Sequence, residues 1–143
     1  MPQIHESWSP ERTVEIIAAQ ADLEGPLLPI LHALQAAFGH VPAQAVPIIA
    51  GALNLSRAEV HGVISFYHDF TASPVDPRVV KLCRAEACQA RGVEALAKAV
   101  EGRVALEPIY CLGLCASGPA ALIDGKPVAR LTAERLLTLA EGL

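Results

Sequence analysis

The fold of this chain is decided by the stretch VVKLCRAEAC (residues 79–88), in which an apolar run leads directly into a pair of cysteines. Val79 to Leu82 has the length and composition of a buried strand. A second stretch, VALEPIYCLGLC (residues 104–115), repeats this arrangement, with a strand that ends near Ile109 and then two more cysteines. We therefore expect each cysteine pair to lie in a short loop at the C-terminal end of a strand.

The segments around these strands predict a small sheet covered by helices. A helical face lies between the strands, and an Asp-Gly turn after them predicts a hairpin that leads to a last helix. The residues that define these elements are Val93, Leu96, Ala97 and Val100; the hairpin segments Ala120–Ile123, Asp124-Gly125 and Pro127–Leu131; and Thr132, Leu136, Leu139, Ala140 and Leu143. Pro108 predicts that the second strand lies at a sheet edge or a strand end, because proline donates no ladder hydrogen bond.

The first half of the chain has the period of helices. Four helices are expected. The first is capped by Ser9 and Pro10, and its apolar face contains Val14, Ile17, Ala18 and Ala21. The second runs from Gly25 and Pro26 to Gly39, with an apolar face of Leu27, Ile30, Leu31, Leu34 and Phe38, and the third covers Gln44–Leu53 with Pro47 in its first turn. The fourth opens with a capping box at Ser56 and Glu59, and its apolar face contains Val60, Val63, Ile64 and Tyr67. The turn-rich segment TASPVDP (residues 71–77) then indicates a linker. We expect an N-terminal helical subdomain over residues 1–73 and an α/β domain over residues 74–143.

Composition limits the compartment and the partners. The chain has 143 residues, 52% of them hydrophobic, and a net charge of −4 without any basic run, which argues against nucleic acid as a partner. The N-terminus lacks the basic start and apolar run of a signal peptide, and no stretch of about 18 apolar residues predicts membrane insertion. We expect a protein of the reducing cytoplasm, where its four cysteines bind metal rather than form disulfides.

The cysteine spacing favours a two-iron cluster. The pairs are C-x4-C at Cys83 and Cys88 and C-x3-C at Cys111 and Cys115, and if the two strands are neighbours, all four thiolates meet at one sheet edge. Structural zinc sites usually use tighter knuckles, whereas a [2Fe–2S] cluster needs sulfurs spread around two irons. Zinc, and four free or disulfide-bonded thiols, remain the alternatives from spacing alone.

Neighbouring residues suit such a cluster. Small residues let the backbone approach the sulfurs and donate hydrogen bonds to them; they are Ala85, Ala87, Gly113, Ala116, Ser117 and Gly118. Leu112 and Leu114 are expected to shield the cluster from water. Arg84 and Arg91 are the two cations that offset its negative charge, although the sequence does not tell where either side chain points.

These motifs resemble the thioredoxin-like [2Fe–2S] subunit of NADH dehydrogenases, the 24 kDa family of respiratory complex I, and within it the gamma subunit of soluble NAD-dependent formate dehydrogenases. The stretches that carry the resemblance are Leu82–Cys88, Tyr110–Ala120, Leu28–Gln35, Gly39–Pro42, Val60–Tyr67 and Leu106–Gly125. The resemblance implies a helical N-terminal bundle followed by a thioredoxin-like [2Fe–2S] ferredoxin domain. It also implies that Cys83, Cys88, Cys111 and Cys115 ligate the cluster.

The same resemblance implies a role in a larger enzyme. The subunit would carry electrons beside a partner that binds FMN and NAD, in a complex whose molybdenum-containing subunit oxidises formate. The alternatives are the same role in a complex I-type NADH dehydrogenase or an NAD-reducing hydrogenase, or a zinc-stabilised interaction module. One departure from the family is the short segment of 22 residues between Cys88 and Cys111, with the shortening placed between Val100 and Val104. We expect it to affect an outer docking face rather than the ligands.

Other chemistry-bearing residues receive simpler interpretations. The histidines lack a ligand-like partner and are expected at the surface or an interface; they are His5, His32, His40, His61 and His68. We expect Phe66 in the core, and Tyr67, Phe70 or Trp8 at an interface. Neither cysteine pair has the C-x-x-C spacing of thioredoxin catalysis, and no phosphate loop or G-x-G-x-x-G is present, so the chain is expected to have no catalytic site of its own.

Overall fold

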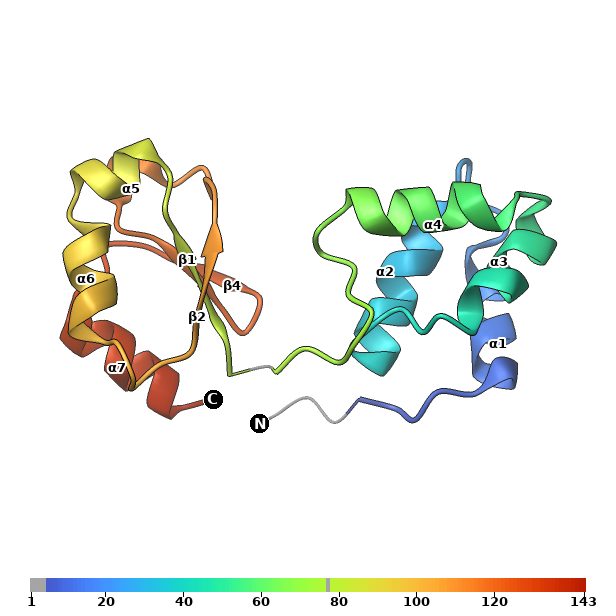
Figure 1. Cartoon of the computed structure of the whole chain (residues 1–143), viewed down its shortest axis with the longest axis horizontal. Helices are drawn as coiled ribbons and strands as arrows, with labels where there is room; N and C mark the ends of the chain where they lie inside the picture. Colours follow the sequence, from blue (N-terminus) through green and yellow to red (C-terminus); the bar gives the residue numbers. More distant parts are fainter. Residues whose placement is uncertain (1–4, 77) are drawn as a thin grey trace. The chain divides into compact units, whose positions relative to one another are not determined.

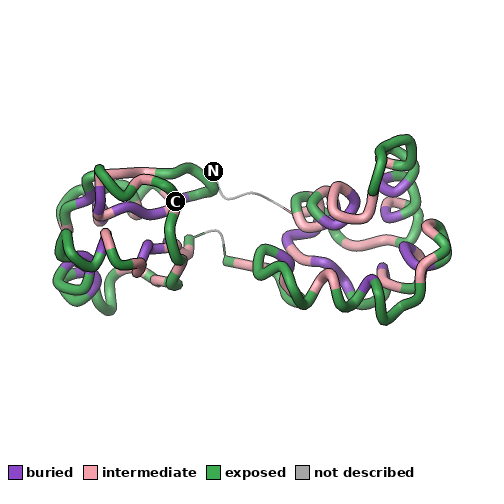
Figure 2. The backbone as a smooth tube through the Cα atoms, turned by 90° about the horizontal axis from the view of Figure 1, so that it is seen from above, coloured by how far each residue is buried: buried purple, intermediate pink, exposed green. Residues whose placement is uncertain are grey.

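The computed structural model describes residues 5–76 and 78–143 (Figure 1). Residues 1–4, and Pro77 of the expected linker, lie outside the described residues. The chain divides into two compact units, a helical unit that ends at Val75 and a sheet unit that includes Asp76–Leu143. Each unit has its own buried core, seen as separate purple segments in Figure 2. No helix in the described part of the chain has the length and apolar character needed to cross a bilayer.

The helical unit contains four helices that begin and end close to where the sequence predicts. They are α1 (Pro10–Gln20), α2 (Leu27–Phe38), α3 (Ala45–Leu53) and α4 (Arg57–Phe66). The Ser9 hydroxyl caps α1 by accepting from the Arg12 N–H, and the capping box at Ser56 and Glu59 opens α4. Gly39 ends α2 with φ 73°, a left-handed conformation that glycine adopts without a Cβ penalty.

The apolar face of α1 is displaced from the predicted one. The buried residues are Thr13, Ile16 and Ile17, whereas Val14 is 54% exposed and Ala18 is also exposed. The prediction missed Thr13 because it counted only apolar side chains. Its hydroxyl donates to the Ser9 carbonyl oxygen at 2.9 Å, so the polar group is satisfied locally and its burial costs little.

The aromatic end of α4 also differs from the prediction. Phe66 was expected in the core, but it is 74% exposed, whereas Phe70 is 7% exposed and packs in the core of the helical unit. Tyr67 is the C-cap of α4 rather than part of its buried face, and it is 42% exposed. The reason is that the helix ends at Phe66 and the chain turns, so that Phe70 reaches back to stack edge-on against His32 at 4.8 Å.

The sheet unit is a four-stranded sheet with helices. Its elements are β1 (Val80–Cys83), α5 (Glu86–Ala90), α6 (Val93–Ala99), β2 (Leu106–Ile109), the short 3-10 turn η1 (Cys115–Ser117), β3 (Ala121–Ile123), β4 (Lys126–Val128) and α7 (Ala133–Glu141). The strand order is β2-β1-β3-β4, so β1 is interior and β2 and β4 are the edges. Figure 1 shows α6 and α7 side by side along the sheet.

The pairing confirms the expected hairpin and edge strand. β1 pairs with β2 in parallel, and β3 and β4 form an antiparallel hairpin whose turn residues Asp124 and Gly125 have φ of 49° and 71°, as an Asp-Gly turn prefers. Each edge strand carries a proline, Pro108 in β2 opposite Leu82 and Pro127 in β4 opposite Leu122. The unit is therefore the thioredoxin-like α/β fold that the sequence predicts.

The core of the sheet unit confirms most of the predicted faces. Val93, Leu96, Ala97 and Val100 are all buried, as the α6 pattern predicts. In α7, however, Leu136 and Leu137 pack on the core, while Leu139 is 36% exposed. Leu143 also packs against the core, so the predicted face is confirmed at Leu136 and Leu143 and is extended by Leu137 rather than by Leu139.

Candidate metal centre

The parallel pairing of β1 and β2 brings the two cysteine pairs to one edge of the sheet. Cys83 is the last residue of β1 and is in register with Ile109, the last residue of β2. The strands therefore end together, and the segments that carry Cys88 and Cys111 both leave from this edge. The backbone N–H of Cys111 donates to the Cys83 sulfur at 3.3 Å, so the predicted convergence of the two segments is confirmed.

Cys83 and Cys88 are built into regular elements and are only 2% and 3% exposed. The Cys83 N–H donates to the Ala120 carbonyl oxygen at 2.9 Å, which ties the end of β1 to the segment before β3. The sequence predicts a short loop between the pair, but the chain forms the helix α5 there, with Cys88 on its buried side. Gln89 secures this helix by donating its side-chain amide to the Arg84 carbonyl oxygen at 2.6 Å.

Cys111 lies in an irregular segment and Cys115 is the first residue of the 3-10 turn η1, and both are exposed. Their sulfurs are 3.6 Å apart, and the Gly113 N–H donates to the Cys111 sulfur at 3.4 Å. Cys111 has φ 74°, a left-handed conformation that costs a non-glycine residue roughly 1–2 kcal/mol. This strained turn aims the Cys111 N–H at the Cys83 sulfur.

Neighbouring thiols shift each other's pKa values at this edge of the sheet. Burial raises the pKa of Cys83, but hydrogen bonds from the Ala85, Cys111 and Leu112 N–H groups outweigh it, so the pKa lies below its ordinary value. Burial raises the pKa of Cys88, and negative charge at Cys83 and Cys115 raises it further. The pKa of Cys115 is raised, first by its hydrogen bond with Cys111 and then by the Cys111 charge.

Such mutual repulsion is what a positive metal centre relieves. Four thiolates close together are unfavourable alone and become favourable when irons bind them. Across the described residues, no set of three or more His, Cys, Asp or Glu side chains is grouped tightly enough for one metal ion. Two separate sulfur pairs suit a two-iron cluster, in which each iron takes two thiolates.

The space around the thiols also fits a cluster. Gly118 is buried, and a Cβ built on it would lie 3.1 Å from the Cys88 sulfur, closer than side-chain packing tolerates without movement. Leu112 and Leu114 are half-buried and pack against the core of the sheet unit, which agrees with a shielding role. The residues present therefore fit the group that the sequence predicts.

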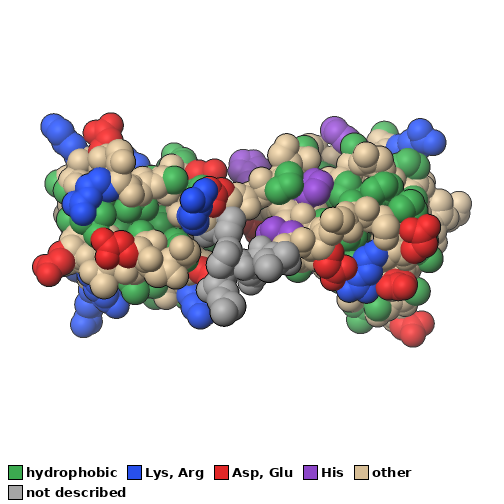
Figure 3. Space-filling view, turned by 90° about the horizontal axis from the view of Figure 1, so that it is seen from below, with side chains coloured by type: hydrophobic (Ala, Val, Ile, Leu, Met, Phe, Trp, Pro, Cys, Tyr) green, Lys and Arg blue, Asp and Glu red, His purple; other side chains and the backbone are tan. Residues whose placement is uncertain are grey.

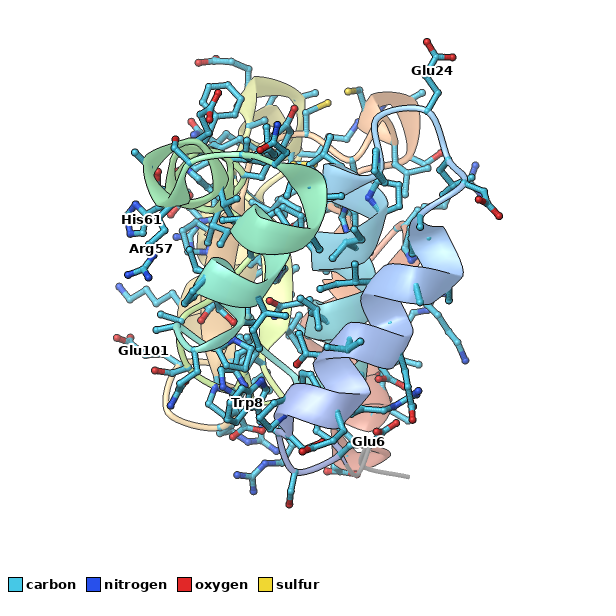
Figure 4. All side chains as sticks on the ribbon, turned by 90° about the vertical axis from the view of Figure 1, so that its right-hand side faces the viewer. Glu6, Trp8, Glu24, Arg57, His61 and Glu101 are labelled. Atoms are coloured by element: carbon cyan, nitrogen blue, oxygen red, sulfur yellow. The ribbon has the colours of Figure 1, made fainter. Side chains whose placement is uncertain are left out.

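The two arginines near the thiols differ in their partners. Arg84 forms an ion pair with Glu94, with nitrogen–oxygen distances of 2.8 and 2.6 Å, and the two line a hollow of about 580 Å³. The hollow is also lined by Glu101, labelled in Figure 4, and by Val104. These residues lie where the segment between Cys88 and Cys111 is expected to be shorter than in the family. The Arg91 side chain instead passes Gly118 beside Cys88.

The remaining predicted candidates stay apart from this centre. His61 extends from the outer face of α4 next to Arg57 (Figure 4), and both are exposed. Trp8 packs against the helical core, and its buried indole N–H has no partner among the described residues. On the face in Figure 3, Lys and Arg are interspersed with Asp and Glu. Sequence reasoning gave no role to Tyr110, which precedes Cys111 and is 71% exposed.

Comparisons with known proteins agree with this arrangement. Residues 13–143 match the family described as thioredoxin-like [2Fe-2S] ferredoxin. The chain is 30% identical over 163 aligned positions to the E subunit of the NADH-quinone oxidoreductase of Escherichia coli (strain K12), covering 96% of this chain and 98% of that protein. It is 27% identical over 132 positions to the NADP-reducing hydrogenase subunit HndA of Solidesulfovibrio fructosivorans, covering 83% and 77% of the two chains.

Proposed function

The chain belongs to the thioredoxin-like [2Fe–2S] ferredoxin family and so carries a [2Fe–2S] cluster, and we propose that it passes single electrons through this cluster as a subunit of a multisubunit oxidoreductase. The observation that carries the proposal is that β1 and β2 end in register and bring both cysteine pairs to one edge of the sheet, where the Cys111 N–H donates to the Cys83 sulfur. When bound, the cluster supplies one-electron chemistry, since it is oxidised and reduced reversibly. The ligands in this proposal are Cys83, Cys88, Cys111 and Cys115.

The protein's own residues prepare this site in two ways. Backbone N–H groups, among them that of Cys111, donate to the Cys83 sulfur and so stabilise a thiolate before any metal arrives. Burial of Cys83 and Cys88 keeps water from one side, while exposed Cys111 and Cys115 leave the other side open to an electron partner.

The partner that we propose is a subunit that binds FMN and NAD. The names of the relatives support a nicotinamide-linked complex, since they are subunits of an NADH-quinone oxidoreductase and of an NADP-reducing hydrogenase. On the helical unit, Phe66 and Tyr67 are exposed and pack edge-on against each other, with ring centroids 5.1 Å apart. Tyr67 also lines a hollow of about 460 Å³ with leucines such as Leu28 and Leu55. We propose Phe66 and Tyr67 as docking residues in place of buried Phe70.

The relatives favour a complex I-type or hydrogenase-type assembly as the complex that contains this chain. A formate dehydrogenase, with a molybdenum-containing catalytic subunit, is the second candidate and rests on the resemblance of the stretch 106–125. In either assembly we propose a cytoplasmic location, consistent with four free cysteines, and two domains over residues 1–73 and 74–143.

One purification tests both levels of the proposal. The full chain is isolated with its native partners and analysed for iron, acid-labile sulfide and an EPR signal after reduction, and we expect two irons and two sulfides per chain. A chain that holds only zinc would contradict the electron-transfer role. Reduction of NAD⁺ by the complex with hydrogen or with formate, and oxidation of NADH, then separates the candidate complexes.

A further inference from the structure

Arg91 and the Cys88 sulfur are neighbours across one small gap. Arg91 ends α5 three residues after Cys88, and its backbone N–H donates to the carbonyl oxygens of Ala87 and Cys88 at 3.2 Å. A Cβ built on Gly118 would lie 3.2 Å from the Arg91 Cδ and 3.1 Å from the Cys88 sulfur. The arginine stem and the sulfur thus both lie close to the position that a Gly118 side chain would occupy.

Gly118 provides this gap through its missing side chain rather than through its backbone. Its φ of −65° and ψ of 165° are open to any residue, so conformation does not require glycine here. The backbone on both sides is fixed: the Arg130 N–H donates to the Ser117 carbonyl oxygen at 2.7 Å, and the Leu131 N–H donates to that of Pro119 at 3.0 Å. A larger residue at position 118 would therefore press on both the Cys88 sulfur and the Arg91 stem.

The other arginine near the thiols has its charge already matched. Arg84 makes two short hydrogen bonds to the Glu94 carboxylate, and this ion pair raises the pKa of Arg84 and lowers that of Glu94. Arg91 forms no ion pair with any residue that the structure describes. No described carboxylate therefore matches the positive charge of Arg91, whose stem lies next to the Cys88 sulfur.

We propose that Arg91, whose stem lies beside Cys88 where Gly118 leaves space, raises the reduction potential of the cluster through its positive charge. Arg84 does not have this effect. The inference rests on the proposed role of Cys88 as a ligand. Reduction adds one electron, and hence one negative charge, to the cluster, and a nearby cation stabilises the reduced state more than the oxidised state. Because Arg91 is exposed, salt screens this effect in part.

The test is a redox titration of the full chain, reduced with dithionite and followed by EPR. For Arg91→Gln we expect a ratio of reduced to oxidised cluster about fivefold lower at a fixed potential, a shift of about 40 mV at about 59 mV per tenfold for one electron. Arg91→Lys should keep most of the original potential. Arg84→Gln is the matched control and should shift it much less. The difference between Arg91→Gln and the unaltered chain should shrink at high salt.

Several outcomes would overturn the inference. They are an unchanged potential in Arg91→Gln at full cluster content, an equal shift in Arg84→Gln, or an Arg91→Lys variant that behaves like Arg91→Gln. If Arg91→Gln and Arg91→Met both fail to hold the cluster while Arg91→Lys retains it, Arg91 has a structural role instead. Absence of iron and sulfide from the unaltered chain would contradict the proposed function itself, which keeps the two failures distinct.

Discussion

The two cysteine pairs are held by different kinds of structure. Cys83 and Cys88 lie on a strand and a helix and are almost completely buried, so the folding of the sheet unit fixes their positions. Cys111 and Cys115 are exposed. Cys111 is oriented by a left-handed backbone conformation and weak hydrogen bonds to sulfur, and Cys115 opens the 3-10 turn η1. The difference indicates that folding of the core fixes the positions of Cys83 and Cys88, whereas metal binding fixes those of Cys111 and Cys115.

The largest expected effect treats both pairs alike. Cys88→Ser and Cys115→Ser should each lose the visible absorption of the cluster, because a hydroxyl replaces a proposed thiolate ligand. Absorption spectra with iron and sulfide analysis measure this, with Ser117→Ala, a change in the same segment, as the control that retains the cluster. A variant of either pair with full absorption would remove that cysteine from the ligand set.

The second test asks whether the core positions the buried pair. Leu82 is fully buried next to Cys83, and Leu82→Ala should cost about 2–5 kcal/mol in the free energy of unfolding, since it leaves a cavity. Urea unfolding of the metal-free chain followed by circular dichroism gives the value. Leu112→Ala, half-buried beside the exposed pair, is the matched change and should cost clearly less. Equal costs would contradict the contrast between the pairs.

A third test compares the pairs without metal. In the metal-free chain, Cys88→Ser should cost about 1–3 kcal/mol because a hydroxyl is buried without an assured partner, whereas Cys115→Ser should leave unfolding nearly unchanged. Alkylation followed by mass spectrometry should label Cys111 and Cys115 first and reach Cys83 and Cys88 only in urea. Rapid labelling of Cys88 in the folded chain would show that its burial is lost without metal.

The pH dependence of labelling sharpens the picture of the exposed pair. Because Cys111 raises the pKa of Cys115, the alkylation rate of Cys115 should still be rising at a pH where an ordinary thiol is already ionised. Cys111→Ser should move this rise to lower pH. A rate profile for Cys115 that is the same with and without Cys111 would mean that the two sulfurs do not interact in solution.

The smallest effect concerns the ion pair beside the buried pair. Hydrogen bonding to Arg84 lowers the pKa of Glu94, so its contribution to stability is present above the pKa of an unfolded glutamate, about 4.3, and is lost as the pH falls through the lower folded value. Thermal unfolding should show Glu94→Gln slightly less stable than the unaltered chain near pH 7, with the gap closing in acid. Glu107→Gln, an exposed change on β2, should show no such closing gap.

Much of this arrangement follows from sequence patterns. The α2 stripe from Ile30 to Phe38, the capping box at Ser56 and the Asp124-Gly125 turn each specify a local structure, and each is found. The strand before each cysteine pair was also predicted, whereas the parallel pairing of β1 and β2 was only a condition of the sequence argument and is supplied by the fold. The local features depend on near neighbours in the sequence, which is why they were predictable.

The rest depends on contacts that a sequence does not contain. The helix α5 is only five residues long, too short to give a helical period, so it was predicted as a loop. Phe70 is buried in the core instead of the predicted Phe66, because the chain turns directly after α4. The ion pair of Arg84 with Glu94 joins residues ten positions apart, and only the fold shows that Arg91, beside the thiols, has no such pair among the described residues.

The prolines of the two edge strands affect whether another strand can add to the sheet. The Ala105 and Ile109 carbonyl oxygens accept from β1 and the residue after it, so Pro108, which alternates with them, turns its missing donor outward; Pro127 interrupts the opposite margin. A foreign strand that tries to extend this sheet meets a gap in the donor row on either side. Addition of a strand from another copy is therefore disfavoured at both edges.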